Sequence, residues 1–120
     1  MTLTATVLDS PAPQALAAFY RALLGWPLGD DSADWVTLRP EAGGAGLSFQ
    51  REPLYVRPTW PSTAGSQQMM SHLDIRVDDL AAAVDHAVAA GATVAEFQPQ
   101  EHVRVCLDPD GHPFCLYVEE

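Results

Sequence analysis

The sequence predicts an α+β domain built from two successive βαβββ modules that fold around one shared cavity. The order strand, helix, strand, strand, strand occurs twice along the 120 residues. Each predicted helix ends at a glycine, and these two glycines, Gly25 and Gly91, lie 66 residues apart. A proline-rich stretch from Pro53 to Gln68 separates the two series. We therefore assign residues 1–52 to module one, 53–70 to a linker and 71–120 to module two, all within one domain, 1–120.

Module one begins with an alternating segment, Thr2 to Leu8, which predicts a strand. Asp9 and Ser10 are residue types that cap helices, and Pro11 and Pro13 suit a helix start. The helix that follows carries apolar side chains at helical spacing, namely Leu16, Phe19, Tyr20, Leu23 and Leu24. Three further segments are expected after it: a polar turn at Gly29 to Ala33 and strands at Trp35 to Arg39 and Gly46 to Arg51.

Module two repeats this order. Ser71 to Val77 predicts a strand, and Asp78 or Asp79 is expected to cap the next helix. The apolar stripe of that helix comprises Leu80, Val84, Ala87 and Val88. Strands are then expected at Thr93 to Gln98, His102 to Leu107 and Pro113 to Val118. The last two form a hairpin around Asp108-Pro109-Asp110-Gly111-His112, with Gly111 at positive φ.

The hairpin register bears on the two cysteines. If Leu107 pairs with Pro113, Cys106 opposes Phe114 and Cys115 opposes Val105. Opposed residues share a face, so the two thiols point to opposite faces of the sheet and no disulfide is expected between them.

The charge is strongly acidic. Sixteen Asp and Glu stand against six basic residues, all arginine, which gives a net charge of −10. Such a surface repels phosphate backbones and anionic lipid, so we expect neither nucleic acid nor membrane partners. No apolar run is long enough to span a bilayer, the first ten residues do not have the pattern of a signal peptide, and two cysteines make no disulfide framework. We expect a cytoplasmic protein.

Three stretches resemble the vicinal-oxygen-chelate superfamily, also called the glyoxalase/bleomycin-resistance fold. They run from Ala17 to Trp26, from His72 to Leu80 and from Asp108 to Phe114, and together they extend over essentially the whole chain. The resemblance implies that the two modules' sheets curve into a partly open barrel, with the ligand, and a metal where present, inside the curve. Within the superfamily the chain is most similar to small glyoxalase-like proteins of largely unassigned function. These share a Phe-Cys ending after Asp-Pro-Asp-Gly and a Pro-Trp-Pro-like stretch before the second module, which is Thr59-Trp60-Pro61 here.

The resemblance also implies where metal ligands would lie. Metal-dependent members take one ligand from the first and one from the last strand of each module and bind two vicinal substrate oxygens at the open positions of the ion. Here His72 matches a ligand position and Cys115 stands where Glu is usual. In module one the first-strand position falls on Thr6, or on Ala5 if the register shifts by one, and the last strand offers Gln50. A set of His72, Gln50 and Cys115 suits Mg²⁺, Mn²⁺ or Fe²⁺ poorly, whereas Zn²⁺ accepts imidazole and thiolate. We expect no metal, with zinc, manganese or iron as the alternative.

Strand alternation predicts which side chains face the cavity. In module two, Leu73, Ile75 and Val77 should pack under the helix, leaving His72, Asp74 and Arg76 toward the ligand. In module one, Leu3, Ala5 and Val7 are expected on the helix side, and Thr4, Thr6 and Leu8 on the cavity side.

Several side chains are candidate ligand contacts. Trp35, Trp60 and Tyr117 are candidates for an aromatic lining, and Arg76 or Arg57 for pairing with an anionic group. Cys115 is either a small core residue or a nucleophile with His72 as its base. The complete predicted ligand-binding set is His72, Asp74, Arg76, Trp35, Gln50, Trp60, Cys115 and Tyr117.

Two functions follow from these expectations. The first is a metal-free protein that binds, and by binding sequesters, a small organic molecule, as bleomycin-resistance-type members do. The alternative is a metal-dependent lyase, isomerase or dioxygenase of the vicinal-oxygen-chelate type, which rests on His72 and on the fold. We also expect a homodimer, because small members of the superfamily often pair and open sheets leave strand edges to cover.

Overall fold

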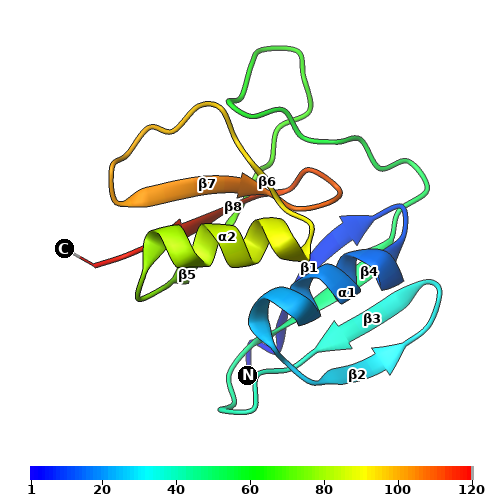
Figure 1. Ribbon diagram of the computed structural model, residues 1–120. Helices are drawn as coiled ribbons and strands as arrows, with labels where there is room; N and C mark the ends of the chain where they lie inside the picture. Colours follow the sequence, from blue (N-terminus) through cyan, green and yellow to red (C-terminus); the bar gives the residue numbers. More distant parts are fainter. Residues whose placement is uncertain (120) are drawn as a thin grey trace. The chain divides into compact units, whose positions relative to one another are not determined.

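The computed structural model describes residues 1–119 and divides the chain into two compact units, Met1–Tyr55 and a second that begins at Val56. Each unit holds one βαβββ series (Figure 1), which confirms the predicted α+β class and its two modules. Module one comprises β1 (Ala5–Ser10), α1 (Pro13–Leu24), β2 (Leu28–Asp31), β3 (Trp35–Leu38) and β4 (Gly46–Arg51). Module two comprises β5 (Leu73–Arg76), α2 (Leu80–Ala90), β6 (Thr93–Val94), β7 (Val103–Leu107) and β8 (Pro113–Tyr117).

The two sheets have the same topology. Their strand orders are β1-β4-β3-β2 and β5-β8-β7-β6, so the last strand of each module lies next to the first. That pair is parallel in both sheets, and the other neighbours are antiparallel. A parallel pair needs a long crossover, which the helix and the two middle strands of each module supply.

The core of module one lies between α1 and one face of its sheet. Tyr20 is fully buried and stacks on Phe49 of β4, with ring centroids 5.6 Å apart. Phe19 packs edge-on against Tyr20 at 4.9 Å. Val36 and Leu38 of β3 pair with Phe49 and Leu47, so the apolar residues of both strands face the helix. This packing fixes which face of the sheet remains for other contacts.

The core of module two is built from smaller helix residues. Ala87 of α2 is fully buried, as are Phe114 and Leu116 of β8. Leu73 and Ile75 pair with these two strand residues, which places them on the same apolar face, as alternation predicts. Val88, a member of the predicted helix stripe, is instead 48% exposed.

The helix ends agree with the sequence at three of four positions. Gly25 adopts the left-handed conformation, with φ of 72°, and Gly91 follows α2. Asp79 caps α2 by accepting a hydrogen bond from the backbone amide of Ala82 at 3.0 Å. The start of α1 differs from the prediction, because β1 continues through Ser10 and the N-cap is Ala12, without a side-chain cap. The Ser10 hydroxyl accepts from the Ala12 amide instead.

The predicted polar turn at Gly29 to Ala33 is wrong, because residues Leu28–Asp31 form β2. All four residues of β2 are exposed, so no alternation of burial marks the segment as a strand. Its pairing comes from β3, and the Thr37 hydroxyl accepts a further hydrogen bond from the Asp30 amide at 2.8 Å.

The predicted strand Thr93 to Gln98 is shortened to the two residues of β6. The Gln98 side-chain amide takes the place of further strand backbone beside β7. Its oxygen accepts from the Val105 amide at 2.8 Å, and its nitrogen donates to the Val105 carbonyl at 2.9 Å. The same nitrogen donates to the Ala95 carbonyl, which closes the turn after β6.

The predicted orientation of β1 is also wrong. Thr6 pairs with Leu47 and Leu8 with Phe49, so Thr6 and Leu8 lie on the face that carries the helix. Val7 pairs with Ser48 and therefore lies on the opposite face, with Ala5. The apolar alternation of Leu3, Ala5 and Val7 thus does not mark the buried face of this strand.

The hairpin of β7 and β8 has the predicted register. Leu107 pairs with Pro113, Cys106 with Phe114 and Val105 with Cys115, and both cysteines are free thiols. Gly111 has a φ of 88° in the connecting turn.

Across residues 1–119, neither helix is long and apolar enough to cross a membrane.

Candidate functional sites on the two sheets

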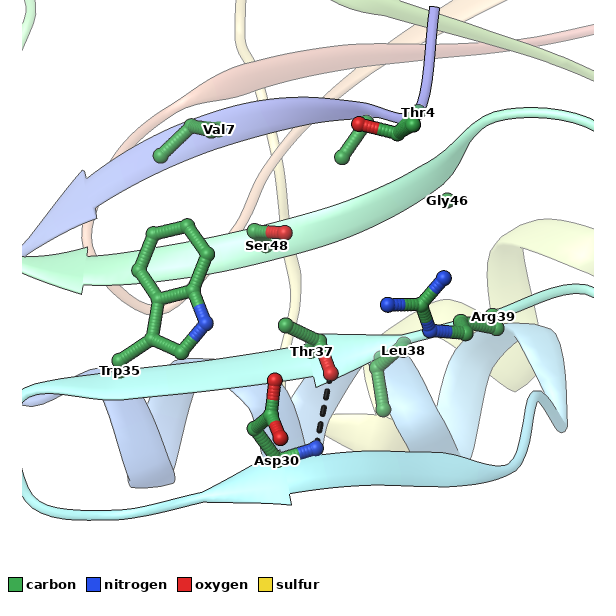
Figure 2. A pocket seen from close by; sticks show the side chains of 10 residues that line it. Thr4, Val7, Asp30, Trp35, Thr37, Leu38, Arg39, Gly46 and Ser48 are labelled. Carbon is green, nitrogen blue, oxygen red and sulfur yellow. Dashed lines mark hydrogen bonds between the residues drawn. The ribbon is translucent and has the colours of Figure 1, made fainter.

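The face of the module-one sheet opposite α1, here called the distal face of module one, carries the candidate site of that module. Val7, Ser48 and Thr37 lie side by side across β1, β4 and β3, and Trp35 pairs with Gln50 one step along. Figure 2 shows Val7, Trp35, Thr37 and Ser48 along this face. Val7 is 44% exposed and Trp35 37%, so apolar surface remains available there.

A pocket of about 200 Å³ opens on this distal face. Its walls combine the Trp35 indole and apolar groups with two buried hydroxyl-bearing side chains, Thr37 and Ser48. One carboxylate, Asp30, and one guanidinium, Arg39, lie at its margin (Figure 2). The complete lining is Thr4, Ala5, Val7, Asp30, Trp35, Thr37, Leu38, Arg39, Gly46 and Ser48. An aromatic face beside a few polar groups is the usual composition of a small-molecule site.

Gln50, predicted as a metal ligand or ligand contact, is engaged within module one. Its amide nitrogen donates to the Asp9 carboxylate at 2.8 Å. The two residues are register partners on β4 and β1, so the hydrogen bond crosses the parallel pair.

The face of the module-two sheet opposite α2 is here called the distal face of module two. It is polar, whereas the distal face of module one carries both apolar and polar side chains. Asp74 pairs with Cys115, and Arg76 pairs with Tyr117, which places all four side chains on this face. Alternation predicted this orientation for Asp74 and Arg76, and the β5–β8 register agrees with it.

His72, Asp74 and Cys115 form a cluster on this distal face. The His72 Nε2 lies 3.1 Å from the Asp74 Oδ1, and one donor atom from each of the three residues lies within 4.8 Å of the other two. Burial raises the pKa of the Cys115 thiol, and the Asp74 carboxylate raises it further by its charge and by accepting the thiol proton in a hydrogen bond. A thiol with a raised pKa is a poor nucleophile at neutral pH, and the His72 imidazole contacts Asp74. His72 and Cys115 thus both contact Asp74, and Cys115 as a nucleophile with His72 as its base stays a prediction.

The remaining predicted residues of the second unit have other partners. Arg76 donates to the Glu119 carboxylate at 3.2 Å. Arg57 donates to the Pro109 carbonyl at 3.2 Å, which ties the linker to the β7–β8 turn. Trp60 donates from its indole nitrogen to the Phe97 carbonyl and packs on the Phe97 ring at 6.1 Å. Both arginines proposed for an anionic group are thus engaged by the protein itself.

The repeat allows a residue-by-residue test of the four-ligand chelate set. Asp74 lies five residues before the N-cap of α2, and Val7 lies five residues before the N-cap of α1. Asp74 pairs with Cys115, and Val7 pairs with Ser48. The module-one counterparts of His72 and Cys115 are therefore Ala5 and Ser48.

Ala5 has no ligand atom in its side chain, and Ser48, a buried residue, offers a neutral hydroxyl. Module one thus supplies no pair of metal ligands of the kind that the superfamily uses. The superfamily's four-ligand chelate set therefore does not fit this chain. Among residues 1–119, the group of three His, Cys or Asp side chains close enough to hold an ion together lies on module two.

Arg39 was missed by the sequence reasoning. It follows β3 directly, and counting in steps of two from Trp35 through Thr37 places it on the same face. No ion pair holds its guanidinium among residues 1–119, unlike those of Arg51 and Arg76. The alternation of β3 was the signal that would have found it.

Comparisons with known proteins agree with this architecture. A family model described as a glyoxalase-like domain matches residues 5–117. A solved glyoxalase/bleomycin resistance protein/dioxygenase family enzyme from Burkholderia phytofirmans is 20% identical, with 98% of each chain covered and a TM-score of 0.72. A glyoxalase-related enzyme from Fulvimarina pelagi is 18% identical over 99% of this chain and 88% of its own, with a TM-score of 0.71.

A protein from Agrobacterium tumefaciens is 24% identical over 100% of this chain and 99% of its own, again with a TM-score of 0.72. At these identities the similarity establishes the fold rather than an activity. A search of curated proteins finds no match. The family model extends over nearly the whole chain and the solved structures share its two βαβββ modules, so the protein belongs to the glyoxalase-like domain family.

Proposed function

We propose that this protein binds a small organic molecule in the distal-face pocket of module one, and that this binding needs no metal. The observation that carries the proposal is the lining of that pocket, where the Trp35 indole lies beside buried Thr37 and Ser48 and near the guanidinium of Arg39. Sequestration of the bound molecule in the cytoplasm is the corresponding physiological role.

The lining favours a flat molecule with an anionic group. An indole face stacks on conjugated rings, and such contacts contribute about 0.5–1.5 kcal/mol beyond the area they bury. A guanidinium without an ion-pair partner suits a carboxylate or sulfonate, since charge-assisted hydrogen bonds are roughly twice as strong as neutral ones. Asp30 at the same margin disfavours a second negative group and orients the ligand.

The test uses aromatic carboxylates, with 2-naphthoate as the reference probe, added to the metal-free protein in EDTA. We expect saturable binding by calorimetry, weakened about tenfold by Arg39→Ala, which removes a charge-assisted contact. Trp35→Leu should weaken binding similarly, because the stacking surface is lost. Arg51→Ala is the matched control, since Arg51 lies on the neighbouring strand and pairs with Asp34.

Equal affinities in Arg39→Ala, Trp35→Leu and the parent protein would contradict this location for the site. Binding that disappears in EDTA would contradict the metal-free part of the proposal and leave the location intact.

A second candidate is a metal-dependent lyase, isomerase or dioxygenase of the chelate type. The observation that favours it is the cluster of His72, Asp74 and Cys115, since His72 occupies a ligand position of the superfamily. Against it stand Ala5 and Ser48 at the counterpart positions of module one. Turnover of a vicinal dicarbonyl or diol substrate that requires added metal and is lost in His72→Ala would favour the enzyme over the binding protein.

A further inference from the structure

We propose that the ligand of the distal-face pocket of module one is an aromatic α-amino acid. Its ring lies on Trp35, and its carboxylate lies at Arg39. Its protonated amine lies between Asp30 and Ser48. The inference rests on the proposed function and deepens it, because it adds a positively charged group to the aromatic carboxylate.

A β-bulge in β2 brings Asp30 to this pocket. Leu28 pairs with Leu38, and Asp31 pairs with Val36. Three steps along β2 thus match two steps along β3, so β2 carries one extra residue. Both pairs lie on the helix-packed face, and the extra residue between them lets Asp30 line the pocket on the distal face.

The bulge leaves the Asp30 carboxylate available to a ligand. The backbone amide of Asp30 already donates to the Thr37 hydroxyl at 2.8 Å. Gly29 permits this approach, because a Cβ there would lie 2.5 Å from the Thr37 Oγ1. Among residues 1–119, no hydrogen bond or ion pair engages the Asp30 carboxylate. An ionised carboxylate only accepts hydrogen bonds, so it favours a donor, and a cationic donor most.

Ser48 supplies a second acceptor from the floor of the pocket. The residue is 3% exposed, and within the part of the chain that the structure describes its hydroxyl has no hydrogen-bond partner. Every fully enclosed side-chain nitrogen or oxygen in that part has a partner, so the Ser48 oxygen is open to the pocket. A nearly buried hydroxyl without a partner favours a polar atom of a ligand. Ser48 and Asp30 lie on either side of Thr37 (Figure 2), so an amine above Thr37 lies between the two acceptors.

The ligand-facing groups follow a fixed order along β3. Trp35, Thr37 and Arg39 share the distal face at steps of two residues, which separates neighbours by about 6.8 Å. The Arg39 side chain extends back along the strand toward Thr37 (Figure 2). The order is therefore an aromatic surface, a pair of acceptors and a guanidinium. An aromatic α-amino acid carries its ring, its amine and its carboxylate in the same order.

Two opposite charges line the pocket without pairing with each other, which supports a zwitterionic ligand. Asp30 and Arg39 both lie at its margin, yet no ion pair joins them among residues 1–119. Arg51, by contrast, pairs with Asp34. A carboxylate without an amine leaves the Asp30 charge without a partner, and an amine without a carboxylate leaves the Arg39 charge without one. A zwitterion pairs with both.

The test compares three ligands that share an indole ring, by calorimetry in EDTA. L-Tryptophan carries both charged groups, indole-3-propionate lacks the amine, and tryptamine lacks the carboxylate. We expect L-tryptophan to bind the parent protein about tenfold more tightly than either analogue, since each analogue gives up one charge-assisted contact.

The variants should separate the two charged contacts. Asp30→Asn should weaken L-tryptophan and tryptamine about tenfold and leave indole-3-propionate no weaker. Arg39→Ala should weaken L-tryptophan and indole-3-propionate and leave tryptamine no weaker. Ser48→Ala should weaken the two amines about threefold, because a neutral acceptor is lost. Asp31→Asn is the matched control, since it removes the same charge from the next residue of β2, whose carboxylate lies on the helix side and accepts from Gln14.

Equal affinities for L-tryptophan and indole-3-propionate in the parent protein would overturn the inference, as would an Asp30→Asn variant that binds L-tryptophan as the parent does. The proposed function is tested separately, because 2-naphthoate carries no amine. Binding of 2-naphthoate that depends on Trp35 and Arg39, with no preference for the amine, would retain the proposed function and reject the amino acid. Failure of all these ligands to bind would reject both.

Discussion

At the residue scale, Asp74 contacts two groups with different proton chemistry, the His72 imidazole and the Cys115 thiol. Its carboxylate keeps the Cys115 pKa above the usual value, second in effect to burial. Replacement by the neutral amide in Asp74→Asn removes the negative charge. We therefore expect the Cys115 pKa to fall, the thiolate fraction at a given pH to rise, and alkylation by iodoacetamide to become several-fold faster.

The measurement uses a Cys106→Ser background in EDTA, so that Cys115 is the only thiol and no metal protects it. The alkylation rate should rise with pH in both proteins, and the Asp74→Asn curve should be displaced to lower pH. Burial acts in both, so the rate should stay below that of a fully exposed cysteine. An unchanged or slower rate in Asp74→Asn would show that the carboxylate does not control this thiol.

Gly111 is a second residue with a local and testable role. Its φ is +88°, and a Cβ there would lie 2.5–2.8 Å from three side-chain atoms of Arg57. Gly65 has a similar φ of +80° with nothing within 4 Å of the added atom. Gly65→Ala should therefore destabilise by about 1–2 kcal/mol through backbone strain alone. Gly111→Ala should destabilise by more, because Arg57 must also leave the turn and lose its bond to Pro109.

Urea unfolding of both variants gives the two free energies, and the double variant Arg57→Ala/Gly111→Ala isolates the contact. Relative to Arg57→Ala, the second substitution should cost no more than Gly65→Ala costs in the parent. Equal losses in the two single variants would mean that Arg57 contributes nothing to the turn.

Part of the candidate site on the distal face of module two could be predicted from residue patterns alone. Leu73 and Ile75 alternate with charged residues, and this placed Asp74 and Arg76 on the correct face. The sequence pattern could not show that Arg76 pairs with Glu119 or that Gln50 pairs with Asp9, because these side-chain hydrogen bonds depend on strand register and on side-chain rotamers. Arg39 differs from these, because the alternation of β3 places it on the distal face; among residues 1–119 its guanidinium makes no ion pair.

At the element scale, Gln98 shows how a side chain can end a strand. Its amide bonds both the amide and the carbonyl of Val105, as backbone of a neighbouring strand would. We expect Gln98→Ala to destabilise module two by about 1–3 kcal/mol, because the part-buried Val105 amide of β7 loses its acceptor. The Val105 carbonyl keeps a partner, since it also accepts from the Ala95 amide at 3.0 Å. Gln98→Glu should retain the accepted bond and lose both donated ones, giving an intermediate loss by urea unfolding.

Hydrogen exchange provides the local measurement for the same variants. The Val105 amide should exchange faster in Gln98→Ala and remain protected in Gln98→Glu. Glu96→Gln is the matched control, since Glu96 is an exposed neighbour before the same turn. Protection of Val105 that is unaffected by Gln98→Ala would assign this strand edge to another partner.

The β1 strand explains why one orientation was predicted wrongly. Leu3, Ala5 and Val7 alternate with threonines and suggest a buried odd-numbered face. Asp9 continues that odd-numbered series, and a carboxylate is costly on the helix-packed face. Asp9 lies instead on the distal face, beside Gln50. Val7 is two residues away on the same strand, so it lies on the distal face as well. The charged end of the strand determines its orientation more strongly than its small apolar residues do.

At the scale of the whole molecule, the repeat could be predicted because the order of elements and the helix-ending glycines recur in both modules, even where the residues between them differ. Gly25 and Gly91 close the helices, and the two sheets share one strand order. The side-chain chemistry of the distal faces does not repeat in the same way. Ala5 and Ser48 occupy in module one the places that His72 and Cys115 occupy in module two. The two modules share their topology and strand register, whereas their distal faces differ in chemistry.

Each sheet leaves two outer strands, β1 and β2 in one and β5 and β6 in the other, and unpaired strand edges favour association. We propose a homodimer whose stability increases with salt, since two chains of charge −10 repel each other at low ionic strength. The screening length shortens from about 30 Å at 0.01 M to about 10 Å at 0.1 M salt, which weakens that repulsion. Light scattering over a concentration series should give twice the chain mass, with the dissociation constant falling as sodium chloride is raised. A monomer at every salt concentration would contradict the dimer, and a dimer that weakens with salt would place attractive ion pairs at its interface.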